Sequence, residues 1–359
     1  MRWFGCVGAV LIFCAVSPLL GQKRGFRPIV GTLPADSGFA LGVGYDQEKF
    51  ANGLLDLRLE AIGSVKKYEQ LDLRLAAPRL ANERLFVEFH TRYRNYPEEN
   101  FWGLGNDIGE GRRVNFRLED WLVSGSGGFR PLPRLRVGAT AGYLRVNTGP
   151  GKDSAFVSID QLFTPEEVPA LLNQPDYSLY GAFADYDSRD RPLDPRAGGF
   201  YQARLTYYDD RNLQRHSFTR FDLELQQYLP VYQKRGTVAM RGLLNLTDAG
   251  AGQTVPFFMQ PTTGGSNDLR GYHQYRFRDE NRLIFNLEYR WEANSYVDLV
   301  GFGDAGRAFG LGSGVTLGSL RGSIGVGGRV KFRERVWLGV DVGYSREGIR
   351  LWLRGSQMF

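Results

Sequence analysis

The sequence predicts an all-β protein, a transmembrane antiparallel β-barrel of about 16 strands. Three observations predict it. The 359-residue chain has no apolar run of 18 or more residues after about residue 21, so it lacks the signature of several membrane-spanning helices. Long segments alternate between apolar and charged residues, and turn-forming residues separate them. Aromatic residues lie near the segment ends, as expected for barrel girdles at membrane interfaces.

The composition excludes several other classes of protein. The chain is 42% apolar and 13% aromatic, which is too hydrophobic for a disordered protein. Its 46 glycines show no three-residue period, so a collagen is excluded. The net charge of +6 comes from 45 basic and 39 acidic residues that are interspersed, so no nucleic-acid partner is expected.

The N-terminus is predicted to be an export signal. Arg2 precedes the apolar run Trp3–Leu20, and polar sequence follows abruptly. The alternative is a permanent N-terminal anchor helix, but Pro18 and the change to polar sequence favour cleavage. We therefore predict a signal peptide over residues 1–21 and an outer-membrane β-barrel over residues 22–359.

Cysteine and histidine content bears on catalysis and metal binding. Cys6 and Cys14 both lie in the predicted signal peptide, so disulfides and thiol chemistry are not expected in the mature chain. His90, His216 and His273 are scattered without a partner at ligand spacing, so no metal site is expected. No G-x-S-x-G elbow occurs. We predict no catalytic residue, no cofactor and no enzyme activity.

Sixteen candidate strands follow the signal. Their predicted bounds are roughly 26–33, 37–46, 53–63, 68–77, 84–95, 112–124, 134–147, 177–186, 199–209, 216–228, 236–247, 280–292, 296–308, 320–332, 336–345 and 348–358. One short helix is predicted at Pro165–Asn173.

The period of the strands indicates the solvent on each side. Successive side chains of a strand point to opposite faces, so each candidate strand has an apolar face and a charged face. A soluble β-sandwich also alternates, but the candidate strands of about 10 to 13 residues are long enough to cross a bilayer at a tilt. We expect Leu55, Leu223, Phe285 and Leu351 to face lipid, with their charged neighbours in a water-filled lumen.

The connections agree with an even number of strands. If the first strand starts in the periplasm, the short connections lie on the periplasmic side of the membrane and the long ones on the extracellular side, as in bacterial barrels. The short connections include Asn82-Glu83, Pro131–Pro133 and Arg333–Glu334, and the long ones are 96–111, 148–176 and 248–279.

Four stretches carry a resemblance to a known family. They are FWGLGN at 101–106, YDSRDRPLDPRAGGFY at 186–201, GGSNDLRGY at 264–272, and NLEYRW at 286–291 with FGDAG at 302–306. In this order they resemble the barrel of the BamA and TamA surface-antigen family of outer-membrane proteins. The resemblance implies a multi-pass protein of the bacterial outer membrane, in contact with its lipid and lipopolysaccharide and inserted by the barrel assembly machinery. It also implies a role in outer-membrane protein assembly or protein translocation, with a client or passenger protein as partner.

The third stretch contains the candidate site. It lies in a glycine-rich connection of some thirty residues, which is too long for a simple hairpin. Alternation points Glu288 and Asp304 into the lumen from adjacent strands, so an inserted sixth extracellular loop would bring Arg270 between two carboxylates. The family resemblance implies the same pairing; the alternative is an exposed turn. The motif consists of Leu269, Arg270, Gly271 and Tyr272.

The two strands that meet at the seam carry further signals. Leu351, Leu353 and Phe359 alternate toward an aromatic end, which resembles the signal by which the assembly machinery receives barrel proteins. Gly355 and Pro28 weaken strand pairing near the place where the first and last strands meet. The alternatives are a seam that opens into lipid and an ordinary closed seam.

The sequence leaves two classes of function. BamA and TamA carry periplasmic POTRA domains, and too few residues separate the predicted signal from the first strand to hold one. The first class is therefore an assembly or translocation barrel that works alone or with a separate periplasmic partner. The second is a passive pore or structural surface protein that retains the family barrel. A soluble β-sandwich enzyme is a distant third.

Overall fold

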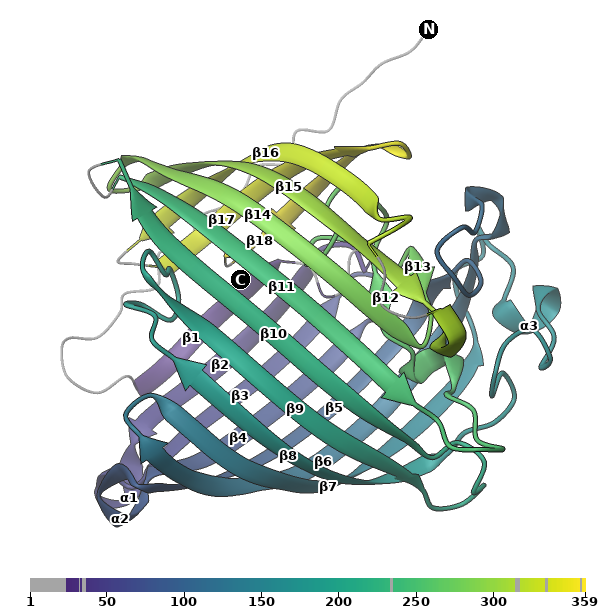
Figure 1. Cartoon of the computed structure of the whole chain (residues 1–359), viewed down its shortest axis with the longest axis horizontal. Coiled ribbons are helices and arrows are strands. Elements are labelled where there is room, and N and C mark those ends of the chain that lie inside the picture. The colour runs from purple at the N-terminus through teal and green to yellow at the C-terminus, as the bar shows by residue number, and fades with distance from the viewer. Residues whose placement is uncertain are drawn as a thin grey trace, which may run out of the picture.

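Sixteen antiparallel strands form one sheet that curls into a barrel (Figure 1). The computed structural model describes residues 24–31, 33, 37–232, 235–313, 317–332, 335–355 and 357–359, so the predicted signal peptide lies outside the described residues. The predicted all-β class and the number of strands are confirmed. None of the helices in the described part of the chain is long and apolar enough to cross a membrane.

The strands follow one another around the sheet in chain order. The main sheet contains β1 (Arg24–Gly31), β2 (Ala40–Lys49), β3 (Leu55–Ser64), β4 (Glu69–Arg79), β5 (Leu85–Phe101), β6 (Val114–Leu132), β7 (Leu135–Pro150), β8 (Asp176–Asp187), β9 (Gly198–Asp210), β10 (Phe218–Val231), β11 (Gly236–Asp248), β14 (Asn281–Asn294), β15 (Val297–Phe309), β16 (Arg321–Phe332), β17 (Arg335–Ser345) and β18 (Gly348–Arg354). A separate two-stranded sheet consists of β12 (Thr262–Thr263) and β13 (Phe277–Arg278). The helical elements are α1 (Phe50–Gly53), α2 (Leu80–Glu83), α3 (Ile159–Leu162) and the 3-10 turns Glu110–Arg112, Phe257–Met259 and Leu311–Ser313.

Apolar side chains cover the outside of the barrel and charged side chains line the inside. Phe285 is 42% exposed and Leu351 is 64% exposed, while Leu55 and Leu223 are half-buried. On the opposite face of β14, Glu288 and Arg290 are fully buried. This polarity is the reverse of a soluble sandwich, in which apolar faces pack together and charged faces meet water.

The three longest strands run well past their predicted ends. β5, β6 and β7 contain 17, 19 and 16 residues, and β5 and β6 remain paired as far as Phe101 and Val114. The connection predicted at 96–111 is therefore shortened to residues 102–113. A strand can extend beyond the bilayer when its neighbour extends with it, because the ladder continues to satisfy the backbone groups.

The helix predicted at Pro165–Asn173 is wrong. The segment forms turns, and the short helix α3 precedes it at Ile159–Leu162. The amide of Val168 donates to the carbonyl of Thr164 at 3.0 Å, which closes a single turn. Pro169 comes next and has no N–H for a second turn.

The long connections pack together at one end of the barrel. Phe257, from the connection between β11 and β14, lies with its ring centroid 4.9 Å from Phe116 of β6 and 5.5 Å from Phe101 of β5. The ring of Phe163, which follows α3, lies 5.1 Å from that of Phe101. All four side chains are buried, so these connections form a hydrophobic cap over that end.

Candidate functional site

The connection between β11 and β14, residues 249–280, which we call loop 6, enters the barrel. Leu269 and Arg270 are fully buried. Two glycines before them, Gly264 and Gly265, have φ angles of 107° and 110°, which side chains rarely adopt. A Cβ on Gly264 would lie 2.9 Å from that of Arg276, so only glycine allows the returning chain to pass so closely.

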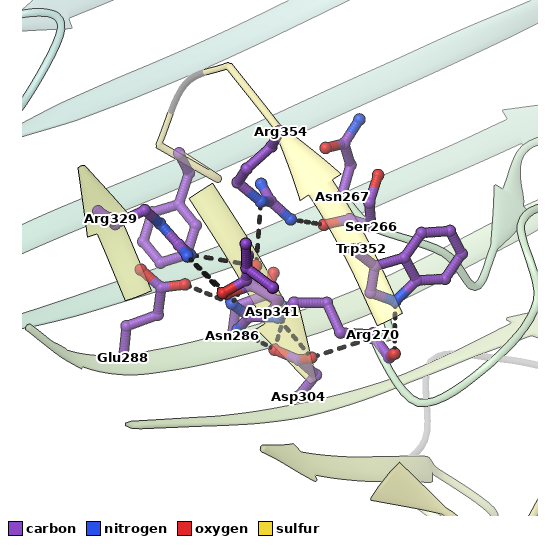
Figure 2. A network of polar contacts seen from close by, with 12 residues as sticks. Ser266, Asn267, Arg270, Asn286, Glu288, Asp304, Arg329, Asp341, Trp352 and Arg354 are labelled. Carbon is purple, nitrogen blue, oxygen red and sulfur yellow. Dashed lines mark hydrogen bonds and ion pairs between the residues drawn. The ribbon is translucent and has the colours of Figure 1, made fainter. Parts of the chain in front are cut away.

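Arg270 lies between two carboxylates from neighbouring strands (Figure 2). Its Nε and Nη2 donate to the Asp304 carboxylate of β15 at 3.0 and 2.7 Å, and its Nη1 donates to Oε1 of Glu288 on β14 at 2.5 Å. The guanidinium carbon lies 3.4 Å from the centroid of the Phe302 ring. The structure thus brings together the arginine and both acidic residues singled out in the sequence.

The charge of Arg270 is well compensated. Burial alone would lower the pKa of Arg270, but the hydrogen bonds that its guanidinium donates to Asp304 and the charge of Glu288 raise it above its usual value. The Arg270 amide also donates to Oδ2 of Asp304 at 3.1 Å. Asp304 therefore holds both the backbone and the side chain of the motif.

The pair of carboxylates belongs to a larger buried ionic network. Asp341 of β17 binds Arg329 of β16 through contacts of 2.6 and 3.1 Å, and its Oδ2 lies 3.0 Å from Nε of Arg354 on β18. The same oxygen lies 3.8 Å from Nη1 of Arg270. In addition, Glu288 accepts from Arg290 at 2.7 Å. The network links loop 6 to strands β14 to β18, and we call it the Arg270 cluster.

Backbone groups of loop 6 are anchored to the last strands of the barrel. The indole Nε1 of Trp352 on β18 donates to the Arg270 carbonyl at 2.7 Å, and Oγ of Ser345 on β17 donates to the Gly271 carbonyl at 2.7 Å. Asn286 of β14 donates to the Asp268 carbonyl at 2.7 Å. Sequence reasoning missed these anchors, and the only signal was alternation, which places Trp352 on the lumen face of β18.

Glycines provide the space in which the motif lies against the wall. A Cβ on Gly343 of β17 would overlap the Arg270 carbonyl. A Cβ on Gly271 would lie 2.7 Å from those of Ser323 and Ser345. The close approach of loop 6 to β17 therefore depends on missing side chains on both partners.

The remaining residues predicted for the site occupy different places. Tyr272 is buried, and its ring centroid lies 5.3 Å from that of Phe277. Leu351 and Leu353 are exposed on the outer face of β18. Phe359 follows the end of β18 and turns inward, where its carbonyl accepts from Nη2 of Arg290 at 3.1 Å. An assembly signal at these three C-terminal residues stays a prediction.

Comparison with known proteins gives the family. The profile of the Omp85 superfamily domain matches residues 134–334, which is more than half of the chain. The chain belongs to the Omp85 superfamily. This membership and the barrel fold place the protein in the outer membrane, which it crosses with its strands.

Solved structures support the same fold. BamA from Haemophilus ducreyi lacking POTRA domains 1-3 is 15% identical with a TM-score of 0.68, over 94% of this chain and 70% of that one. CdiB from Escherichia coli is 12% identical with a TM-score of 0.62, over 94% of this chain and 63% of that one. CdiB from Acinetobacter baumannii is 11% identical with a TM-score of 0.53, over 91% of this chain and 57% of that one. The chain thus spans less than two thirds of either CdiB, and a comparison with curated protein sequences gave no match.

Proposed function

We propose that this Omp85 superfamily barrel takes part in outer-membrane protein assembly or protein translocation, and that a client segment engages the seam between β1 and β18. The observation that carries the proposal is the strand pairing. Within the described residues, β1 pairs only with β2 and β18 pairs only with β17. The first and last strands therefore each present an edge to a further strand.

The composition of the two strands favours exchange at this edge. β1 has eight residues and β18 has seven, so each offers few backbone hydrogen bonds. Pro28 lies in the middle of β1 and has no amide hydrogen to donate. An extended segment of another chain adds to such an edge through main-chain hydrogen bonds, and its affinity grows with the number of bonds it makes.

The Arg270 cluster supports this function as a brace. A barrel whose seam opens loses lateral support at β18, and the contacts of loop 6 to β17 and β18 replace it from inside. Trp352 and Arg354 of β18 both contact loop 6, the latter through the Ser266 carbonyl. We infer that the cluster keeps the C-terminal strands in place while β1 or a client moves.

A passive pore is less well supported. Loop 6 occupies part of the lumen, and the aromatic cap packs over the same end of the barrel. Both reduce the space through which a solute could cross the centre. A path at the seam does not depend on that space.

A seam cross-link tests the proposal. The pair P28C and L351C places one cysteine near the middle of β1 and one in the middle of β18. The pair V342C and L351C links outward residues that face each other in the β17–β18 ladder. In liposomes, we expect a short bis-maleimide to abolish catalysed folding of a urea-unfolded barrel client in the first variant only. Undiminished catalysis by the cross-linked seam variant would refute a seam mechanism.

A further inference from the structure

A second polar site lies on the lumen wall, apart from the Arg270 cluster. A cavity of about 490 Å³ lies between loop 6 and strands β9, β10, β11 and β14. Its charged lining comes from the inward faces of these strands. The lining includes Arg204, Arg220, Asp222, Glu224, Gln260 and Arg282.

Both carboxylates of the cavity have partners on their own wall. Asp222 accepts from the amide nitrogen of Asn245 on the neighbouring strand. Glu224 accepts from Nε of Arg241 and from Nε2 of Gln226, each at 2.8 Å. These contacts leave the arginines of the cavity to other acceptors.

The arginines mostly contact neutral groups. Nη2 of Arg220 donates to the Met259 carbonyl at 2.7 Å, and Nη1 of Arg282 donates to the Thr262 carbonyl at 2.8 Å and lies 3.5 Å from the Asp268 carboxylate. Arg204 lies 5.6 Å above the Phe183 ring and pairs with no carboxylate among the described residues. The acidic groups in and beside the cavity are Asp222, Glu224 and Asp268. The basic groups are Arg204, Arg220, Arg241 and Arg282, so one positive charge is left over.

Gln260 places an unsatisfied acceptor beside this positive site. It lines the cavity from loop 6 and is 3% exposed. Its Nε2 donates to the Val255 carbonyl at 3.3 Å, but its Oε1 has no hydrogen-bond partner among the described residues. A buried acceptor without a donor is unfavourable, so a ligand that brings a hydroxyl hydrogen is preferred over one that does not.

We propose that this cavity binds a small soluble anion that carries a hydroxyl group, of the phosphate or phosphate-monoester class. The guanidinium groups of Arg204, Arg220 and Arg282 bind the anionic oxygens, for which their planar forks are suited. Oε1 of Gln260 has almost no accessible surface in the free protein, so the ligand hydroxyl donates to it after the side-chain amide turns into the cavity. The strand wall separates this site from the lipid, so the ligand enters through the lumen.

Calorimetry on the purified full chain in detergent, at pH 6, tests the site with inorganic phosphate and sulfate. Phosphate carries a hydroxyl hydrogen at this pH and sulfate does not. We expect phosphate to bind at least threefold more tightly than sulfate. A smaller preference, or no phosphate binding, would overturn the proposal.

Three variants locate the site. We expect Arg204→Gln to weaken phosphate binding at least tenfold, while Arg74→Gln, on the lumen face of β4, leaves it within twofold. Gln260→Leu is expected to bring the phosphate and sulfate affinities within twofold of each other. Unchanged phosphate binding by Arg204→Gln, with heat-modifiable migration showing a folded barrel, would refute the assignment. If Arg204→Gln does not fold, Arg204→Lys takes its place with an expected loss of at least threefold, and a smaller loss is equally decisive against the site.

Discussion

At the scale of single residues, the energetics of Arg270 are governed by desolvation. A buried ion pair gains little over an apolar pair of the same shape, because each charge loses its hydration. Removing one member is costly, since the other charge stays buried without a partner. Arg270 is fully buried, and so are the contacting atoms of Glu288 and Asp304. Its removal would leave two carboxylates with fewer donors in the same place.

We therefore predict that Arg270→Ala lowers the free energy of unfolding by about 3 to 5 kcal/mol. Arg270→Lys keeps the charge but not the planar fork, so its loss should be intermediate. Urea unfolding in detergent, followed by heat-modifiable migration, measures both.

The matched control is Arg74→Ala on β4. The Arg74 side chain is 51% exposed and lies 3.3 Å from Asp72, which also contacts His90 at 2.9 Å. An exposed pair of this kind contributes about 0 to 1 kcal/mol. Equal unfolding midpoints for the Arg270 and Arg74 variants would show that the buried cluster does not stabilise the barrel.

At the scale of elements, the docking of loop 6 on β17 depends on backbone contact. A methyl group on Gly343 would overlap the Arg270 carbonyl, while one on Gly328 of β16 would have no atom within 4 Å. We expect Gly343→Ala to destabilise the barrel by about 1 to 3 kcal/mol through overpacking. Limited proteolysis of loop 6 should be faster in Gly343→Ala and unchanged in Gly328→Ala. Equal cleavage in the two variants would contradict close docking.

The strands were predictable because their signal is local. In residues 285–291 a period of two separates lipid-facing from lumen-facing side chains. In a membrane barrel the apolar face points outward to lipid, whereas in a soluble β-protein it points inward to the core. The same period placed Glu288 and Asp304 on the lumen side before any contact was known. The sequence alone did not exclude an exposed loop for Arg270, and the resemblance to a family favoured insertion.

The remaining anchors were not predictable because they join distant segments. Trp352 contacts Arg270 across 82 positions of sequence, and Arg278 of β13 contacts Glu99 of β5 across 179. Periodicity shows that such side chains face inward but not which partner they meet. The extension of β6 to 19 residues has the same origin, since it depends on pairing with neighbours of matching length.

At the scale of the whole molecule, the barrel combines a capped lumen with a seam at which β1 and β18 are not paired to each other among the described residues. Arg278 strengthens the cap, because its Nη1 donates to the Phe257 carbonyl at 2.7 Å and its Nη2 to Glu99 at 2.9 Å. The occupied lumen and the two strand edges therefore favour different uses of the barrel. A pore would need the first to open, whereas strand exchange needs only the second.

Planar-bilayer recording separates these two uses of the barrel. We predict that the wild-type protein shows no large steady conductance, because loop 6 and the aromatic cap obstruct the lumen. Replacing residues 255–278 with a short Gly-Ser linker removes Phe257 of the aromatic cap together with β12, β13 and the Arg270 motif, and should produce a large steady conductance through the freed lumen. Heat-modifiable migration verifies that this variant folds. A large steady conductance in the wild type would instead favour a pore, because the lumen would then be open with loop 6 in place.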